Sequence, residues 1–185
     1  MCSSDLVIRG CAEAKPGRRE TWINDAIIDV FETMHRRGHA HSVETWRDGK
    51  LVGGVYGLSL GGAFFAESKF SRETDASKVA LVHLAARLKA GGYLLLDAQF
   101  PNPHLDQFGA INIAEERFQA LLARALEREG DFYGLGKAGV AGATGGGASS
   151  GGTSGGGGPP GAATPASGAG GASGWSVLQV ITQTS

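Results

Sequence analysis

The sequence predicts an α/β fold of the α+β kind, with a mixed sheet and flanking helices. Three strand-like segments follow one another between residues 40 and 67, and Gly-containing turns join them, which is typical of an antiparallel meander. A helical segment then leads to a short apolar run at residues 93–98. A strand reached through a helix crossover lies parallel to its neighbour, so we expect the sheet to be mixed.

Two helices are expected ahead of the meander. The first begins at Ser4 or Asp5 and runs to about Ala14. The second opens at Thr21 and ends at Gly38, where a glycine suits the C-terminal cap. Apolar side chains at helical spacing give each helix a face to bury: Leu6, Ile8 and Cys11 in the first, and Ile27, Phe31 and Met34 in the second.

The meander is expected to have strands at residues 40–47, 51–59 and 63–67, with turns at Asp48-Gly49 and Gly61-Gly62. Glycines inside a strand mark a bulge or a close approach by a ligand or another backbone. The second strand contains three of them, Gly53, Gly54 and Gly57.

The second half of the fold is expected to be a crossover helix, a buried strand and a final helix. The crossover helix opens at Asp75 or Ser77 and ends at Gly91-Gly92. The strand covers residues 93–98, and the final helix covers residues 114–126. The crossover helix has a wide apolar face, made of Val79, Leu81, Val82, Leu84 and Leu88.

A change of composition divides the chain. Residues 137–174 hold sixteen of its 31 glycines and no aromatic residue. Such a segment cannot bury enough apolar surface to offset its ordering entropy, so we interpret it as a flexible linker. The predicted organisation is a catalytic domain at residues 1–136, a Gly-rich linker at 137–174, and a C-terminal strand at 175–185 that completes the domain.

The charge and the cysteines limit the function classes. A net charge of −1 argues against an extended nucleic-acid footprint but allows a small contact with one RNA end. Two cysteines, Cys2 and Cys11, are too few for a disulfide framework and favour a reducing cytoplasm. No segment has the apolar length of a membrane span, and the N-terminus does not resemble a signal peptide. We expect a monomer that needs no cofactor.

Two histidines and two arginine pairs invite a functional interpretation. His39 and His41 alternate along one predicted strand, but no third ligand lies nearby in the sequence, so no metal site is predicted. Arg18-Arg19 and Arg36-Arg37 are candidate phosphate contacts, and ordinary charged surface is the alternative. His83, within a predicted helix, is expected to be packed or solvated.

Between Val7 and Phe118 the chain carries a series of motifs that together are more specific than any single one. They are Thr21-Trp22-Ile23, the segment from Gly38 to Trp46, the segment from Leu51 to Gly57, the segment from Glu67 to Arg72, the segment from Ala76 to Leu81, Asp97-Ala98-Gln99, Pro103-His104-Leu105 and Gly109-Ala110. In order and spacing this series resembles the leucyl/phenylalanyl-tRNA–protein transferase family.

The resemblance implies a GNAT-like catalytic domain of the kind shared with acyl-CoA transferases. It also implies transfer of Leu or Phe, and more weakly Met, from aminoacyl-tRNA to proteins that begin with Arg or Lys. The product is marked for degradation. The chain departs from the family pattern in three ways: it begins after the expected upstream domain, it has Lys69 where Met is usual, and its Gly-rich insertion is long.

The implied reaction is aminolysis of an activated ester, which depends mainly on positioning. By resemblance, Gln99 contacts the attacking amine, Asp97 orients it, and Glu67 helps bind the Arg or Lys of the acceptor. Because an amide is a poor base, Gln99 is interpreted as a positioning group with Asp97 as its electrostatic partner. Solvated strand-end side chains are the alternative, and on either view we expect Asp97→Ala to leave folding intact.

The aminoacyl pocket must accept Leu and Phe. Its expected wall includes Trp22, Val55, Tyr56 and Phe70, and Ser71 is assigned to the same substrate-binding group. The apolar members fit a protein core equally well, and for Val55 the core is the simpler interpretation. For Lys69 three possibilities stay open: its side chain extends into solvent, it meets a phosphate, or it spoils the pocket.

Two other functions remain possible from the sequence. One is an acyl-CoA-dependent GNAT acetyltransferase, but the segment from Ser71 to Asp75 before the crossover helix lacks the glycine-rich turn that holds pyrophosphate. The other is a truncated remnant that binds tRNA or peptide without turnover.

Overall fold

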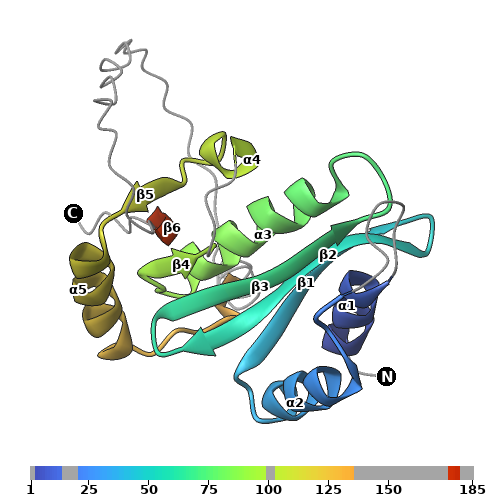
Figure 1. Cartoon of the computed structure of the whole chain (residues 1–185), viewed down its shortest axis with the longest axis horizontal. Helices are drawn as coiled ribbons and strands as arrows, with labels where there is room; N and C mark the ends of the chain where they lie inside the picture. The colour runs from blue at the N-terminus through green and yellow to red at the C-terminus, as the bar shows by residue number, and fades with distance from the viewer. Residues whose placement is uncertain (1–2, 14–20, 99–102, 136–174, 180–185) are drawn as a thin grey trace, which may run out of the picture.

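The computed structural model describes residues 3–13, 21–98, 103–135 and 175–179. A six-stranded mixed sheet runs through this part in the order β1-β2-β3-β4-β6-β5 (Figure 1). The strands are β1 (Ala40–Arg47), β2 (Lys50–Leu60), β3 (Ala63–Ser71), β4 (Leu95–Asp97), β5 (Ile111–Ile113) and β6 (Trp175–Gln179). The helices are α1 (Ser3–Ala12), α2 (Asp25–Arg36), α3 (Ala76–Ala90), α4 (Pro103–Asp106) and α5 (Glu115–Leu126).

The predicted fold class is confirmed. Strands β1, β2 and β3 form an antiparallel meander. Helix α3 then crosses over, and β4 pairs parallel to β3. None of the described helices is long and apolar enough to cross a membrane.

Two element boundaries differ from the expectation, and two short elements were not predicted. Helix α2 begins at Asp25 and not at Thr21, because the Asn24 side chain caps it by accepting the N–H of Ile27 at 3.0 Å. Strand β3 continues past Glu67 to Ser71. Helix α4 and strand β5 were not predicted, since four and three residues are too short to give a periodic signal.

Strand β6 brings the C-terminal part of the chain into the sheet. It lies between β4 and β5 and is antiparallel to both (Figure 1). The expected linker at residues 137–174 and the last residues, 180–185, lie outside the described residues.

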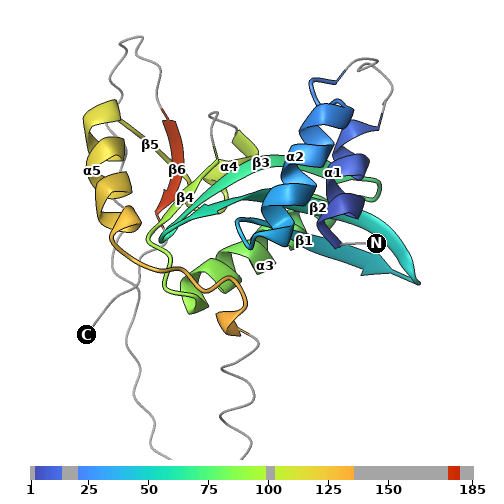
Figure 2. The same cartoon turned by 90° about the horizontal axis from the view of Figure 1, so that it is seen from below.

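The sheet has two covered faces. Helix α3 lies on one, and α1 and α2 lie on the other (Figure 2). Because side chains alternate along a strand, Val55 packs with the residues under α3, whereas Tyr56 packs with those under α1 and α2. Two of the five apolar positions expected to be buried on α3, Val79 and Val82, are exposed at 45% and 51%.

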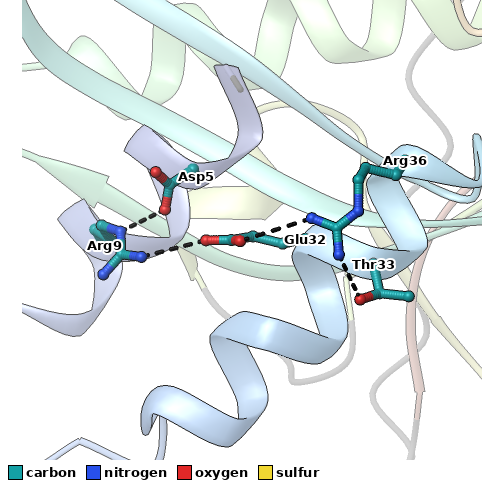
Figure 3. Close-up of polar contacts among 5 residues, drawn as sticks. All are labelled: Asp5, Arg9, Glu32, Thr33 and Arg36. Carbon is teal, nitrogen blue, oxygen red and sulfur yellow. Dashed lines mark hydrogen bonds and ion pairs between the residues drawn. The ribbon is translucent and has the colours of Figure 1, made fainter. Parts of the chain in front are cut away.

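Helices α1 and α2 are joined by a chain of charged side chains (Figure 3). The Arg9 guanidinium contacts Asp5 on its own helix and donates to Glu32 of α2 at 3.2 Å. Arg36, four residues after Glu32, lies 3.9 Å from it and donates to Thr33 at 2.8 Å. Arg36 therefore takes part in a surface network, which favours the interpretation of Arg36-Arg37 as ordinary charged surface. The other arginine pair, Arg18-Arg19, lies outside the described residues.

Strand β3 contains a β-bulge at Glu67. Tyr56 pairs with Ser68 and the next residue, Gly57, pairs with Ala66, so Glu67 is an extra residue opposite β2. Gly57 makes this geometry possible, because a Cβ there would lie 2.1 Å from the carbonyl oxygen of Phe65. The glycine pattern in β2 thus marks a bulge in the neighbouring strand.

We predict that Gly57→Ala destabilises the fold by about 2–3 kcal/mol, because the new methyl group overlaps backbone that cannot rotate away. Urea unfolding measures the change. Gly62→Ala is the control, since its Cβ would meet its nearest neighbour at 3.1 Å and needs only a small shift. Equal losses in the two variants would contradict this account of the bulge.

His41 is a buried titratable group, 5% exposed, and its ring stacks on Phe132 with centroids 4.3 Å apart. Its Nδ1 atom has no hydrogen-bond partner among the described residues. Burial, helped by the nearby His35 ring, lowers the pKa of His41 to about 4. His41 is therefore neutral in the folded protein at neutral pH.

The stability of the fold decreases as pH falls, because the unfolded state binds a proton at His41 more readily than the folded state does. Between an unfolded pKa near 6.5 and a folded pKa of about 4, only the unfolded state binds the proton, so stability is full above the upper value and is lost as pH falls. We predict that His41 contributes roughly 2 kcal/mol to the stability lost between pH 7 and pH 5. Urea unfolding at both pH values should show a smaller loss for His41→Phe than for the parent. The exposed His83→Gln should behave like the parent, and a parent-like His41→Phe would contradict the assignment.

Candidate functional site

Strands β3 and β4 diverge where the predicted catalytic residues lie. Their parallel pairing covers Ala63 with Leu95, Phe64 with Leu96 and Phe65 with Asp97. The bulge at Glu67 follows on β3, and β4 ends. A cavity of about 70 Å³ opens at this point; it is lined by Val55, Ala66, Glu67, Ser68, Lys69, Leu81, Ala98 and Leu105.

The bulge determines which side chains reach this cavity. Lys69 pairs with Val55 and faces α3, whereas Phe70 faces α1 and α2. Without the extra residue the two side chains would exchange faces. Glu67 is half-buried and lines the cavity from the bulge itself. A re-aimed side chain beside a cavity is a common use of bulges.

Asp97 lies deeper than expected. It is 1% exposed, and its carboxylate has interaction partners. For Asp97 the alternative of a solvated strand-end side chain is therefore wrong, and so is the expectation that this carboxyl group lies outside the core; β6 pairs with β4 along its whole length. Ala98, the next residue, lines the cavity, and Gln99 lies outside the described residues. The structure thus brings Glu67 and the end of β4 to one cavity and leaves the position of Gln99 open.

The four residues expected to bind substrate lie elsewhere. Tyr56 and Phe70 are both 2% exposed and pack together under α1 and α2, and burial, with Cys11 and Glu67 adding to it, raises the pKa of Tyr56. Trp22 is 53% exposed ahead of α2. Ser71 accepts the N–H of Ser77 at 2.8 Å and so caps α3. Val55 and Tyr56 were expected in one pocket wall, but they lie on opposite faces of the sheet, because adjacent strand residues point in opposite directions.

A second cavity of about 190 Å³ adjoins the first. Three residues, Lys69, Leu81 and Leu105, line both. Asp75, Ser77, Lys78 and Phe108 complete the second cavity. Sequence reasoning missed Leu105 and Phe108 as site residues, because the short helix α4 that carries Leu105 gives no periodic signal. Leu81 was expected on the buried face of α3, but nothing in the sequence indicates that a cavity reaches it.

A further hollow of about 500 Å³ is a different feature. It follows the outer edge of β1 and includes His35, Glu44, Trp46, His83 and Tyr133, with none of the predicted catalytic residues. The described residues contain no group of three His, Cys, Asp or Glu side chains able to hold a metal ion. We therefore place the candidate site at the two adjoining cavities, where Glu67 and the end of β4 meet.

A family model described as "Leucyl/phenylalanyl-tRNA protein transferase" matches residues 3–123. The chain belongs to this family. The match includes Glu67 and both strands that form the diverging pair. It therefore covers the whole candidate site except the C-terminal strand β6, which seals the edge of β4.

Curated members of the family are close in sequence. The leucyl/phenylalanyl-tRNA–protein transferase of Caulobacter vibrioides (strain NA1000 / CB15N) is 57% identical over 141 residues, which is 76% of this chain and 63% of that protein. The Hyphomonas neptunium protein is 59% identical over 128 residues, 69% of this chain and 50% of that protein. The Maricaulis maris protein is 56% identical and covers 71% and 61%. The chain thus spans between half and two thirds of these relatives.

Among solved structures, a putative acetyltransferase from Agrobacterium tumefaciens is similar, with a TM-score of 0.33 and 18% sequence identity. The similarity covers 51% of this chain and 83% of that chain. A likeness this low carries no argument about function, so the assignment to the family rests on sequence.

The burial of Asp97 changes what its substitution does. We predict that Asp97→Ala destabilises the fold by about 1–3 kcal/mol, because it leaves the partners of a buried carboxylate unsatisfied. Asp97→Asn keeps the shape and should lose less stability. Thermal melting of both variants measures the difference. If Asp97→Ala melts at the parent temperature, the carboxylate does not support the strand end.

Proposed function

We propose that this chain transfers leucine or phenylalanine from aminoacyl-tRNA to the N-terminal Arg or Lys of acceptor proteins, marking them for degradation. The observation that carries the proposal is the meeting of Glu67 and the end of β4 at an apolar-walled cavity, in a chain of this family. The name of the relatives gives the reaction class and the two amino acids. We also propose that the chain is a monomer, that it acts in the cytoplasm, and that it needs no cofactor.

The proposed reaction is an aminolysis that balances without a redox step. The lone pair of the acceptor α-amine attacks the ester carbonyl carbon, and a C–N bond forms. The C–O bond to the ribose then breaks, and the ribose oxygen leaves with the electron pair and takes up a proton, while the amine nitrogen loses one. Since the ester is already activated, holding the two reactants in line supplies much of the rate.

The proposed role of each side chain follows from its position at the cavity or at the end of β4. Glu67 lines the cavity and, in the proposal, pairs with the cationic side chain of the acceptor, a contact that suits carboxylate and guanidinium geometry. Asp97 is buried at the end of β4 and, in the proposal, orients the amine through Gln99, which makes Asp97 a positioning residue. Val55, Ala66 and Leu81 offer the apolar contacts that Leu and Phe side chains need.

The size of the first cavity adds a requirement. At about 70 Å³ it is smaller than the roughly 150 Å³ that holds a benzene ring, so a phenyl group needs additional room. Lys69 forms part of the wall and is exposed, so its flexible side chain can move aside. The proposal therefore includes widening toward the second cavity when phenylalanine binds.

The acyl-CoA alternative lacks its phosphate cradle. In that class the free N–H groups at the start of the crossover helix hold pyrophosphate. Here the N–H of Ser77 is donated to Ser71, and those of Lys78 and Val79 are both donated to Asp75. The first turn of α3 has little left to offer an anion, which favours the aminoacyl-tRNA reaction.

We predict that the chain transfers Phe from charged tRNA to a peptide that begins with Arg, and that Glu67→Gln lowers this rate about tenfold or more. A peptide that begins with Ala should be a poor acceptor and should respond little to the substitution. The measurement is steady-state transfer of labelled Phe to both peptides. Glu129→Gln, an exposed carboxylate outside both cavities, is the matched control.

The Caulobacter vibrioides relative, run in parallel, shows that the assay works. Transfer by that relative with none by this chain would favour the non-catalytic remnant. Equal use of the Arg and Ala peptides by an active parent would contradict the acceptor pocket.

A further inference from the structure

Strand β1 directs peptide groups away from the sheet. In the described sheet β1 is an outermost strand, and its ladder is with β2 (Figure 1). The N–H of Ser59 donates to the carbonyl of His39 at 2.7 Å, so odd-numbered residues of β1 bond to β2 and even-numbered ones, such as Glu44, point outward. The Ala40 carbonyl fits this alternation, because it accepts a hydrogen bond from Nδ1 of His35 at 2.7 Å, outside the ladder.

The hollow of about 500 Å³ follows this outer edge. Five consecutive residues of β1, from Ser42 to Trp46, form one wall. Val79, His83 and Arg87 of α3 are spaced four residues apart, so they share one side of the helix, and they form another wall. Because an extended chain advances about 3.3 Å per residue, the wall along β1 admits roughly four residues of an extended polypeptide.

Contacts between the walls set the direction of the hollow. At one end the Thr45 hydroxyl donates to the Ala76 carbonyl, at the start of α3, at 2.9 Å. At the other end the His41 ring stacks on Phe132, and the guanidinium of Arg87 lies 5.8 Å from the centre of the Phe132 ring. Helix α3 therefore runs antiparallel to β1, and one end of the hollow lies at the first turn of this helix.

The lining contains a hydrogen-bond acceptor that lacks a donor. Glu44 accepts the indole N–H of Trp46 at 2.7 Å on one carboxylate oxygen, Oε2. The other oxygen, Oε1, is buried and has no hydrogen-bond partner among the described residues. A buried acceptor without a donor is costly, so a ligand that brings an N–H group to it is favoured. Because the lining also includes a cation, Arg87, and aromatic and aliphatic groups, it does not select one kind of side chain.

The first turn of α3 separates this hollow from the candidate site. Lys78 lines the second cavity, and its neighbour Val79 lines the hollow. Glu67 lies on β3, two strands from β1, which is a distance of roughly 10 Å that three or four extended residues span. A polypeptide whose first residue meets Glu67 can therefore continue past the first turn of α3 and enter the hollow.

We propose that the outer edge of β1 binds the acceptor polypeptide as an added strand, antiparallel to β1, at about its fifth to eighth residues. This inference rests on the proposed function and extends recognition beyond the first residue of the acceptor. Acceptors that share only an N-terminal Arg or Lys differ in the residues that follow. Main-chain hydrogen bonds to a strand edge bind such chains with little dependence on their sequence.

The experiment measures peptide binding by calorimetric titration of the full chain. The main probe is a ten-residue peptide that begins with Arg and continues with alternating Ser and Val. Its first four residues and its last six residues are prepared as two separate peptides. The whole peptide should bind at least about tenfold tighter than either piece, because one chain then occupies the cavity and the hollow together.

Methylation of the probe's backbone tests whether it binds as a strand. In an added strand, alternate residues direct their N–H groups to β1. One methylated probe lacks the N–H groups of its fifth and seventh residues, and the other lacks those of its sixth and eighth. One of the two should lose most of the tenfold advantage, and the other should keep it. This comparison uses the parent chain and does not depend on the folding of a variant.

Two substitutions on α3 locate the binding. Val79 lines the hollow and its side chain is exposed, so Val79→Trp fills the hollow without entering the core. Val82 is exposed on the same helix but does not line the hollow, and Val82→Trp is the matched control. Val79→Trp should weaken binding of the whole peptide about tenfold, to the level of its first four residues, whereas Val82→Trp should leave it unchanged. Thermal melting verifies that both variants are folded.

Four results overturn the proposal: no binding of the whole peptide by the parent, equal binding of the two methylated probes, a whole peptide that binds no tighter than its last six residues, or equal losses in folded Val79→Trp and Val82→Trp. Failure of the proposed function is a different outcome. If the hollow binds the peptide as expected but no Phe is transferred to it, the strand-addition site stands and the enzymatic proposal fails. If transfer to the whole peptide and to its first four residues is equally efficient, the enzymatic proposal stands and the strand-addition site fails.

Discussion

The single extra residue in β3 is the constraint on which the rest of the site depends. Because Glu67 is an extra residue in the register of β3 with β2, every side chain after it exchanges faces relative to an unbroken strand. Phe70 joins the apolar cluster under α1 and α2, and Lys69 turns to the cavities. Gly57 makes the bulge possible, because it has no side chain to clash with the carbonyl group of Phe65.

Helix α3 links the stability of the domain to the proposed chemistry. Leu84 and Leu88 anchor it fully buried against the sheet, while Leu81, one turn earlier, contributes to both cavities. Its first turn is closed by Ser71 and by backbone acceptors. The backbone of that turn therefore has few N–H groups left for an anion, and the exposed Lys69 has no ion-pair partner among the described residues.

The position of Asp97 shows why the stability of the fold and the proposed chemistry are difficult to separate. The carboxylate terminates β4, is covered through the pairing of β4 with β6, and is nearly inaccessible. A polar group in such a place is held rigidly, and it interacts with its neighbours more strongly than a solvated group does because the local dielectric is low. That rigidity suits a group that orients another side chain, and it also makes the carboxylate part of the core.

Local patterns were sufficient for much of the fold and for the composition of the site. Turn glycines and alternation located β1 and β2, helical periodicity located α3, and the motif series led to Glu67 and Asp97. The glycines of β2 indicated a bulge or a close approach, but not that the inserted residue lies on β3. It also did not indicate that Tyr56 and Phe70 share one face, which depends on that insertion.

By itself, the sequence determined the types and order of the longer elements and the family, since these are expressed in short-range spacing and in motif identity. Only the tertiary structure decided which side chains meet. It inserted β6 between β4 and β5, buried Asp97, and joined two cavities at Lys69. These outcomes depend on strand pairing between distant segments and on one inserted residue that exchanges the faces of the side chains after it. Neither is encoded in the periodicity of any single segment.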